Sequence, residues 1–479
     1  MKILHLTMLY ILAVSLVSCG EEKEIDKPNI LFIFADDQCY KTIRELNNSE
    51  IITPTIDELA RRGTVFTTAY NMGGWNGAIC IASRTMFNTG RFLWRAFDAE
   101  QDLRGLAGEG KLWSKEMERL GYETFFTGKW HVKIGPPEIF HHVGSVRPGM
   151  PEDTPEAYNR PLNRDDWEWT PWDTSFGGFW EGGTHWSEVV ANETMDFLDT
   201  AARSDKPFFM YVAFNAPHDP RQSPKEYVDM YPLEHIALPE SFLPEYPYKD
   251  EIGCSVKLRD ERLAPFPRTA YAVKVHRQEY YAIITHMDRQ IGRILDKLEE
   301  TGEADKTYIF FSADHGLSVG HHGLIGKQSM YDHSLRPPMI VVGPDIPEGR
   351  RLDMEVYLQD IMPTTIEYAG GDVPDYVEFS SLRKLIEGTR SESYHPEIYG
   401  AYMDLQRMIR MDDYKLIAYP YAGVLRLFDL SEDPEEINDL AGDPDQEVRI
   451  RTMYDRLRET MTEMGDTLDL NSFELHREQ

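Results

Sequence analysis

Apolar runs of strand length alternate with helical patterns along most of this 479-residue chain. The runs are ILFIFA (30–35), VFTTAY (65–70), ETFFTG (123–128), FFMYVAF (208–214), TYIFFSA (307–313) and MIVVG (339–343). Helical periodicity covers 53–63, 112–121, 187–202 and 277–302. Continuous apolar strands separated by helices are typical of parallel sheets that are buried on both faces. The pattern therefore predicts an α/β fold, with a mostly parallel central sheet flanked by helices.

The pattern changes after about residue 370. MIRMDDYKLIAYP and VLRLFDL alternate as antiparallel strands do, and a helical pattern follows at 446–464. We predict a first domain over 28–370 and a smaller α+β C-terminal subdomain over 371–479. Residues 132–186 are irregular and rich in Pro, Gly and Trp, so we expect a long loop insertion there.

The N-terminus has the pattern of a bacterial lipoprotein signal. An apolar run follows Lys2 and ends in Leu16-Val17-Ser18-Cys19, which resembles a lipobox. We predict a signal peptide over 1–19, lipidation of Cys19 as the membrane contact, and a polar tether over 20–27. A plain secretory signal is the alternative. Either reading predicts an exported protein, and the lipoprotein reading predicts one in the periplasm or anchored on the outer membrane or cell surface.

Charge and cysteine content narrow the possible partners. A net charge of −31 argues against nucleic acid, because phosphate binding favours a basic surface. An anionic substrate would need a local cluster of cations. Four cysteines do not form a disulfide framework. With Cys19 lipidated, a bridge between Cys39 and Cys254 is possible and leaves Cys80 unpaired.

Polar residues follow four of the apolar runs directly. The carboxyl ends of parallel strands share one edge of a sheet, where sites of open α/β folds form. Carboxylates grouped there suit Ca²⁺, although an acidic pair also starts polar turns. Lysines and histidines at the same edge would neutralise an anion. The residues concerned are Asp36, Asp37, Asp314 and His315 for the metal, and Lys129, His131, His218 and Lys327 for the anion.

Residues 80–91, CIASRTMFNTGR, resemble the signature of the formylglycine-dependent type I sulfatases, C-x-P-S-R followed by T-G-R. Ala82 stands where the family usually has proline. PNILFIFADDQ, TGKWH, NAPHDP and SADHGLSVGHHGLIGKQSMYDHSLRPPMIVVG match the family in the same order. The likeness continues through YKLIAY and LFDLSEDPEEINDLA towards the C-terminus. It implies an alkaline-phosphatase-like fold and hydrolysis of sulfate esters.

The resemblance also implies a cofactor and a mechanism. A separate maturase would convert Cys80 to formylglycine (3-oxoalanine), whose hydrate attacks sulfur. One Ca²⁺ would be held by Asp36, Asp37, Asp314, His315 and the converted Cys80. Arg84 would hold the hydrate, and Lys129 and Lys327 would neutralise the sulfuryl oxygens. His218 would protonate the leaving oxygen, and His131 would remove a proton to expel sulfate.

The substrate is less constrained by the sequence. Residues 167–186 hold five of the nine tryptophans, which either pin a loop to the body or form a wall for sugar rings. We expect a sulfated mono-, oligo- or polysaccharide, with candidate contacts at Trp75, His185, Arg221 and Arg277. A phosphodiesterase or phosphonate hydrolase of the same superfold is one alternative. A non-catalytic glycan-binding relative is another.

Overall fold

A computed structural model describes residues 27–151, 155–158, 161–163, 165, 169–264 and 266–470. The predicted signal peptide, Cys19 and all of the tether except Lys27 lie outside these residues. Among the described helices, none combines the length and the apolar character needed to cross a membrane.

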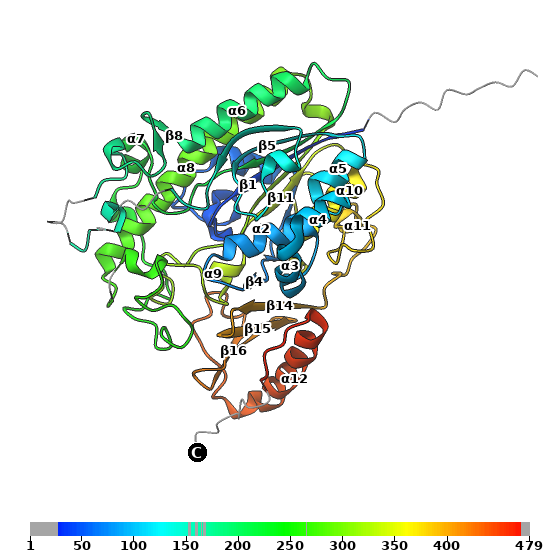
Figure 1. The fold of residues 1–479 in the computed structure, drawn as a ribbon. Coiled ribbons are helices and arrows are strands. Elements are labelled where there is room, and N and C mark those ends of the chain that lie inside the picture. The colour runs from blue at the N-terminus through cyan, green and yellow to red at the C-terminus, as the bar shows by residue number, and fades with distance from the viewer. Residues whose placement is uncertain are drawn as a thin grey trace, which may run out of the picture.

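An eight-stranded sheet forms the centre of the molecule, in the order β12-β2-β11-β10-β1-β9-β5-β6 (Figure 1). Its strands pair in parallel, except that β11 runs antiparallel to both β10 and β2. This confirms the mostly parallel sheet predicted above. The strands are β1 (Asn29–Ala35), β2 (Thr64–Phe66), β5 (Glu123–Lys129), β6 (His142–Arg147), β9 (Phe208–Ala213), β10 (Thr307–Ala313), β11 (Met339–Val342) and β12 (Arg350–Leu352).

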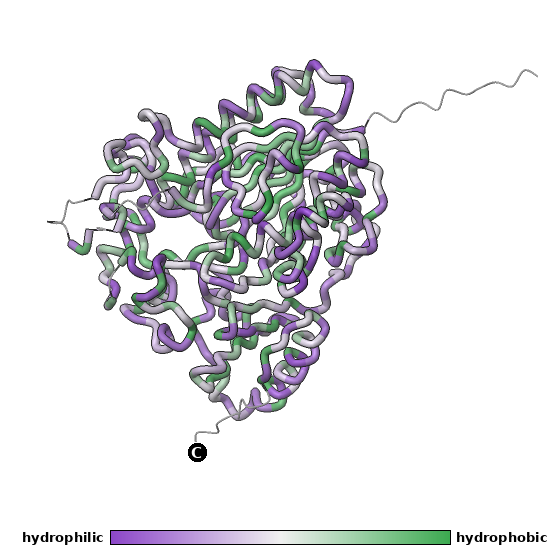
Figure 2. Tube along the Cα trace, viewed as in Figure 1, coloured by the Kyte–Doolittle hydropathy of each residue, from purple (hydrophilic) through white to green (hydrophobic). Residues whose placement is uncertain are grey.

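Alternate side chains of β1 enter two separate cores, one on each face of the sheet. Ile30, Phe32 and Phe34 pack with α2 (Ile79–Thr89), α5 (Trp113–Arg119) and α10 (Ile361–Tyr368). Leu31 and Ile33 pack with α1 (Pro54–Arg62), α6 (Trp186–Ala201) and α8 (Ala270–Glu300). Both sets are fully buried, and each such side chain contributes about 1.5–3 kcal/mol to folding. The strands accordingly form the apolar centre of the chain in Figure 2.

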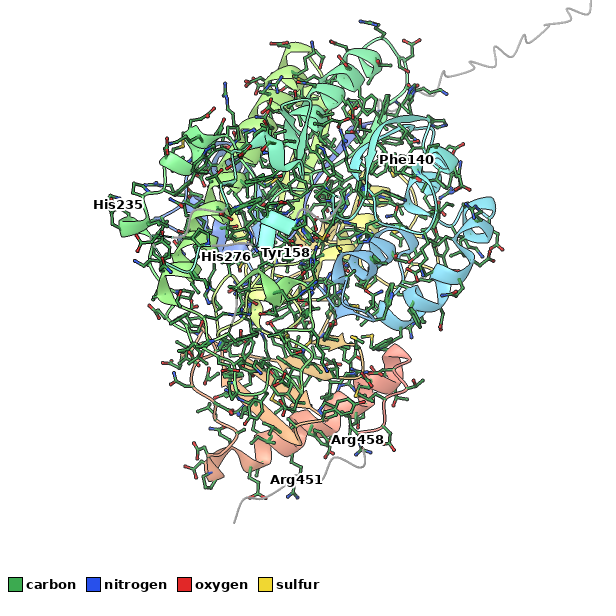
Figure 3. The ribbon with its side chains drawn as sticks, turned by 60° about the vertical axis from the view of Figure 1, so that its left-hand side comes forward. Phe140, Tyr158, His235, His276, Arg451 and Arg458 are labelled. Carbon is green, nitrogen blue, oxygen red and sulfur yellow. The ribbon has the colours of Figure 1, made fainter. Side chains whose placement is uncertain are left out.

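The C-terminal subdomain is a second, antiparallel sheet covered by one helix. Its strands β14 (Glu397–Tyr402), β15 (Gln406–Met411), β16 (Tyr414–Tyr419) and β17 (Val424–Asp429) form a meander, and α12 (Glu447–Met464) packs on it. Figure 3 shows Arg451 and Arg458 pointing outward from α12. The short strand β4 (Gly73–Gly74) joins this sheet beside β14. Gly73 is needed there, because its φ is +89° and a Cβ would lie 2.0 Å from the Ala401 carbonyl oxygen.

Two predicted elements differ from the structure. The run 65–70 divides between β2 and β3 (Ala69–Tyr70), and β3 pairs with β13 (Val356–Tyr357) outside the main sheet. The expected loop 132–186 contributes the edge strand β6 and the hairpin β7 (Trp180–Glu181) to β8 (Thr184–His185). These strands are short, and the periodicity of side chains along the sequence does not indicate which backbones pair. The remaining helices are α3 (Leu93–Ala99), α4 (Leu103–Gly108), α7 (Lys225–Asp229), α9 (Asp332–Leu335) and α11 (Arg383–Ile386).

The possible Cys39–Cys254 bridge does not form. Both thiols are free and buried, and the Cys254 Sγ donates a hydrogen bond to the Gln328 carbonyl oxygen at 3.1 Å.

Candidate active site

The site lies at the carboxyl edge of the main sheet, where β1, β5, β9 and β10 end. Asp36 and Asp37 follow β1, and the chain turns there because Asp37 has a φ of +68°. Two contacts support this left-handed turn. The Asp37 N–H donates to Asp314 Oδ1 at 3.1 Å, and the Tyr280 hydroxyl donates to the Asp37 carbonyl oxygen at 2.5 Å.

Helix α2 supplies Cys80 and Arg84 from adjacent turns of the same face. Arg84 is fully buried, and its Nε donates to Asp314 Oδ2 at 3.0 Å. Its Nη1 donates to the Lys129 carbonyl oxygen at 2.8 Å. One guanidinium thus joins α2 to the ends of β5 and β10. The Cys80 Sγ lies 3.1 Å from His131 Nδ1, so the thiol faces the centre of the cluster.

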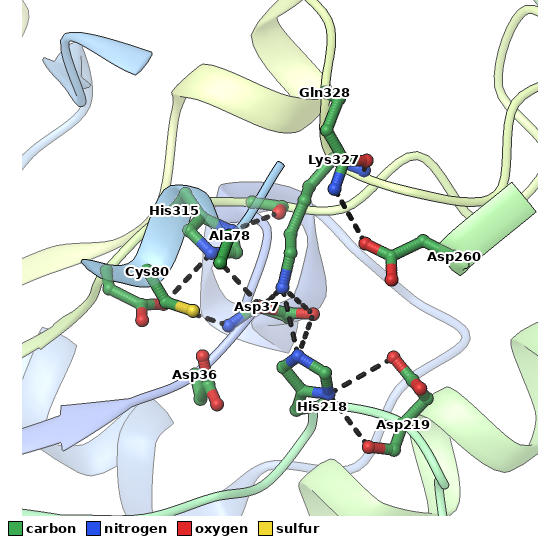
Figure 4. Close-up of polar contacts among 12 residues, drawn as sticks. Asp36, Asp37, Ala78, Cys80, His218, Asp219, Asp260, His315, Lys327 and Gln328 are labelled. Atoms are coloured by element: carbon green, nitrogen blue, oxygen red, sulfur yellow. Dashed lines mark hydrogen bonds and ion pairs between the residues drawn. The ribbon is translucent and has the colours of Figure 1, made fainter. Parts of the chain in front are cut away.

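Two lysines lie opposite the acidic pair. The Lys129 ammonium contacts Asp36 and is fully buried. The Lys327 Nζ lies 2.8 Å from Asp37 Oδ1 and 3.0 Å from His218 Nε2 (Figure 4). Buried ions persist only when they are paired. The acidic chain therefore holds the local cations that an anion would need.

The metal candidates have the donors that a hard cation prefers. One ligand atom each of Asp36, Cys80, Asp314 and His315 lie within 4.8 Å of one another. Asp37 lies beside them, its Oδ1 3.2 Å from His315 Nε2. Among the described residues, Asp36 Oδ1 and His315 Nε2 are buried without a hydrogen-bond partner. Buried polar atoms are usually satisfied, so these two fit ligation of a cation. Three carboxylates suit Ca²⁺, and the histidine is the less usual ligand.

The pKa values of the buried acidic groups in the cluster are shifted in opposite directions. Burial and the neighbouring Asp314 raise the pKa of Asp36 well above its ordinary value. Burial would also raise the pKa of Cys80, but Lys129, Lys327 and His131 hold it well below the usual range. A thiol at this position therefore favours the thiolate. The field that stabilises it would stabilise any anion at the same place.

Several residues at the site are not among the candidates predicted from the sequence. Asp219 approaches His218 Nδ1 through Oδ1 at 3.1 Å and through its carbonyl oxygen at 2.8 Å. Arg259 pairs with Asp219 at 3.4 Å and contacts Asp260. Gln328 Nε2 donates to Asp260 Oδ2 at 2.7 Å and to the Gly77 carbonyl oxygen at 2.8 Å. Asp219 and Gln328 lie within the quoted motifs NAPHDP and SADHGLSVGHHGLIGKQSMYDHSLRPPMIVVG and could have been found there. Arg259 and Asp260 come from a loop without a pattern.

The four candidate substrate contacts are dispersed. Trp75 is partly buried, with its ring 5.4 Å from that of Phe97. His185 is buried, and its Nδ1 accepts from the Ser187 N–H at the start of α6. Arg221 is buried, with Nη1 2.9 Å from His276 Nδ1. Arg277 lines a cavity beyond Tyr280. The structure does not gather them beside Cys80, and their contact with substrate stays a prediction.

The described tryptophans of 167–186 are partly anchored to the body. The Trp169 indole donates to Glu279 Oε1 at 2.9 Å, and the Trp180 indole donates to the Pro171 carbonyl oxygen at 3.3 Å. Trp186 is buried under the guanidinium of Arg147. These contacts favour the loop-pinning reading for these three. Trp167 lies outside the described residues.

Comparison with known proteins assigns a family. The sulfatase family model matches residues 28–371. A second model, the C-terminal region of N-sulphoglucosamine sulphohydrolase, matches residues 320–463. An arylsulfatase of Clostridium perfringens is 29% identical over 474 residues, covering 88% of this chain and 92% of that protein. An N-acetylglucosamine-6-O-sulfatase of Bacteroides thetaiotaomicron is 25% identical, covering 96% and 91%.

Solved structures share the fold. A protein in complex with its substrate D-glucosamine-2-N,6-O-disulfate has a TM-score of 0.71 at 22% identity, covering 94% of this chain and all of its own. A phosphonate monoester hydrolase from Silicibacter pomeroyi has a TM-score of 0.72 at 20% identity, covering 93% and 97%. The chain is a member of the sulfatase family, and thus a sulfuric ester hydrolase with the alkaline-phosphatase-like fold.

Proposed function

We propose that this protein hydrolyses a sulfate ester of a saccharide and releases inorganic sulfate. One observation carries the proposal: Cys80, the residue of the sulfatase signature, lies within the same buried cluster as three carboxylates, two lysines and His131. A tetrahedral dianionic or monoanionic group is the ligand that such a field favours.

The saccharide part rests on the relatives. One relative is named an N-acetylglucosamine-6-O-sulfatase, and one solved structure is of a protein with its substrate D-glucosamine-2-N,6-O-disulfate. Both names specify a sulfated amino sugar. The match to N-sulphoglucosamine sulphohydrolase covers the C-terminal subdomain. The arylsulfatase relative supports sulfate-ester chemistry without a sugar.

The cofactors follow from the family and the donor set. Asp36, Asp37, Asp314 and His315 would hold one Ca²⁺, with residue 80 as a further ligand. When bound, a divalent ion polarises a sulfuryl oxygen and lowers the pKa of a coordinated hydroxyl. Formylglycine at position 80, made by a maturase that reads the segment 80–91, would supply the nucleophilic hydroxyl as its hydrate.

The side chains around the ester would divide the remaining work. Arg84 orients residue 80 through α2 and holds Asp314 in place. Lys129 and Lys327 offset the charge on the sulfuryl oxygens. His218 Nε2 points to Lys327 and would donate a proton to the departing sugar oxygen. His131 Nδ1 lies 3.1 Å from the Cys80 Sγ and would take the proton from the second hydroxyl at that position.

Export would bring the enzyme to its glycan. The lipobox at Cys19 and the tether would place it at a membrane surface facing outward, in the periplasm or on the cell surface.

The test is a screen of defined sulfated mono- and oligosaccharides with protein coexpressed with a maturase, and free sulfate as the readout. We expect release from at least one sugar sulfate, with 4-nitrophenyl sulfate as a simple reference. Faster cleavage of an aryl phosphodiester or phosphonate monoester would favour the hydrolases whose fold is shared. Binding of sulfated glycan without any turnover by matured protein would favour the glycan-binding alternative.

A further inference from the structure

A cavity lies beside the candidate site, with Tyr280 in its wall. Its volume is about 550 Å³, within the range typical of small-molecule sites. It is lined by the loop after β1 (39–50), the segment after β10 (317–321), α8 at 277–281, and two short stretches at 238–240 and 434–435. None of its lining residues is among the catalytic or metal-binding residues proposed above, and Arg277 is named there only as a candidate substrate contact.

The charges of this cavity cancel. Its cationic side chains are Lys41, Arg277 and Arg336, and its acidic ones are Glu50, Glu240 and Glu435. Lys41 contacts Glu435, and Arg277 lies 3.5 Å from Glu50. Burial and the nearby Arg277 hold the pKa of His321 well below its ordinary value, so this ring adds no charge. A bound anion would be repelled by three carboxylates, and a bound cation would be repelled by three cationic side chains. A neutral polar molecule meets neither penalty.

The walls combine aromatic rings with hydrogen-bonding groups. Tyr280 and Tyr281 lie side by side, with ring centroids 6.5 Å apart. Arg277 Nη2 donates to the Tyr281 hydroxyl at 2.6 Å, whereas Arg277 Nε is buried and has no hydrogen-bond partner among the described residues. A buried donor without an acceptor is costly, and a ligand hydroxyl would satisfy it. Sugar rings offer both an apolar face and hydroxyls.

Tyr280 joins this cavity to the catalytic centre. Its ring lines the cavity, while its hydroxyl donates to the Asp37 carbonyl oxygen and accepts from the Cys39 N–H at 2.9 Å. The strained turn at Asp37 is thus held by a side chain that also contacts any occupant of the cavity.

We propose that this cavity is a second saccharide site, which binds an unsulfated sugar unit through Arg277 and the Tyr280–Tyr281 wall. The proposal rests on the proposed function only for its choice of a saccharide among neutral polar ligands. The unit belongs either to the same glycan chain as the sulfate ester or to a separate glycan.

The test measures binding of neutral saccharides to the full exported chain by saturation-transfer difference NMR and calorimetry. The probes are triacetylchitotriose and cellotriose, with choline and inorganic sulfate as charged comparisons. Arg277→Met removes the unpartnered donor, and Ser49→Trp fills the cavity from an exposed lining position. Arg289→Met is the matched control, because Arg289 is exposed on the same helix outside the cavity.

We expect at least one trisaccharide to bind, with about tenfold weaker binding in Arg277→Met and Ser49→Trp and unchanged binding in Arg289→Met. Ser49→Trp and Arg289→Met should release sulfate from a sulfated monosaccharide at the wild-type rate, so failure of this site is separable from failure of the enzyme. If one chain spans both sites, Arg277→Met raises KM for a sulfated oligosaccharide only. If a separate glycan binds, KM is unchanged. Absence of binding by both trisaccharides, or equal binding by wild type and both cavity variants, would overturn the proposal.

Discussion

The Nδ1 atom of His218 lies 3.1 Å from Asp219 Oδ1, while its Nε2 atom lies 3.0 Å from the Lys327 ammonium. Both atoms that Asp219 presents to Nδ1 are acceptors, so Nδ1 carries a proton and Nε2 is left to face the substrate. Arg259 and His218 hold the pKa of Asp219 well below its ordinary range, in spite of burial. The carboxylate therefore holds the Nδ1 proton and would stabilise the positive charge of the doubly protonated ring, whose second proton, on Nε2, is the one that the proposed acid donates.

Asp219→Asn should weaken general-acid assistance. We expect kcat on a sugar sulfate to fall by about 10–100-fold. The rate on 4-nitrophenyl sulfate should change little, because its leaving group needs no proton. Asp360→Asn is a matched control, since Asp360 is a buried carboxylate whose partners are His395 Nε2 at 2.9 Å and the N–H groups of Tyr357 and Ser380. An equal loss on both substrates would show that Asp219 has only a structural role.

Lys327→Gln should remove one of the two cations that face the ester. The kcat/KM for any sulfate ester should fall by about 100-fold or more, because a charged donor in a dry site is strongly stabilising. Lys133→Gln is the comparison, as Lys133 is exposed and pairs with Glu100. Steady-state kinetics on 4-nitrophenyl sulfate provide the measurement, and similar values for both variants would contradict the assigned role.

Calcium removal should abolish turnover and lower the thermal midpoint. Ca²⁺ at 100 times its Kd should restore about 2.7 kcal/mol of stability. Asp36→Asn should lose both effects, whereas Asp445→Asn, in the exposed 3-10 helix Pro444–Gln446, should keep them. Differential scanning calorimetry with and without EGTA provides the readout. A midpoint that is indifferent to EGTA in wild type would count against a resident ion.

The stability of the fold should decrease as the pH falls from about 6.5 to about 4. Burial lowers the pKa of His322 to about 4, so in this window the unfolded chain binds a proton that the native protein does not. The stabilisation is complete above pH 6.5 and is lost towards pH 4, by up to about 1.4 kcal/mol per pH unit. His322→Gln should flatten this slope in urea unfolding experiments. Parallel slopes for both proteins would refute the assignment to His322.

Much of the catalytic edge could be predicted from the sequence because its residues follow continuous apolar strands. Asp36, Lys129 and Asp314 come directly after such a run and His218 follows another at four residues, and parallel strands bring their carboxyl ends together. The edge strand β6 was missed, because its pairing with β5 depends on backbone hydrogen bonds and not on side-chain periodicity.

The surroundings of the site depend on tertiary contacts that no local pattern encodes. Arg259 and Asp260 come from a loop after β9 and meet Asp219 and Gln328 only in the folded chain. Arg277, a candidate substrate contact from the sequence, lines a separate cavity together with Tyr280, three residues later on α8, whose hydroxyl contacts Asp37.

The most direct test is sulfate release by matured protein with Cys80 intact and with Cys80→Ala. Mass analysis of the peptide spanning 80–91 should show loss of sulfur in the intact protein, and kcat/KM for a sugar sulfate should fall by at least about a thousandfold in the variant. Full retention of sulfate release by Cys80→Ala would contradict the account.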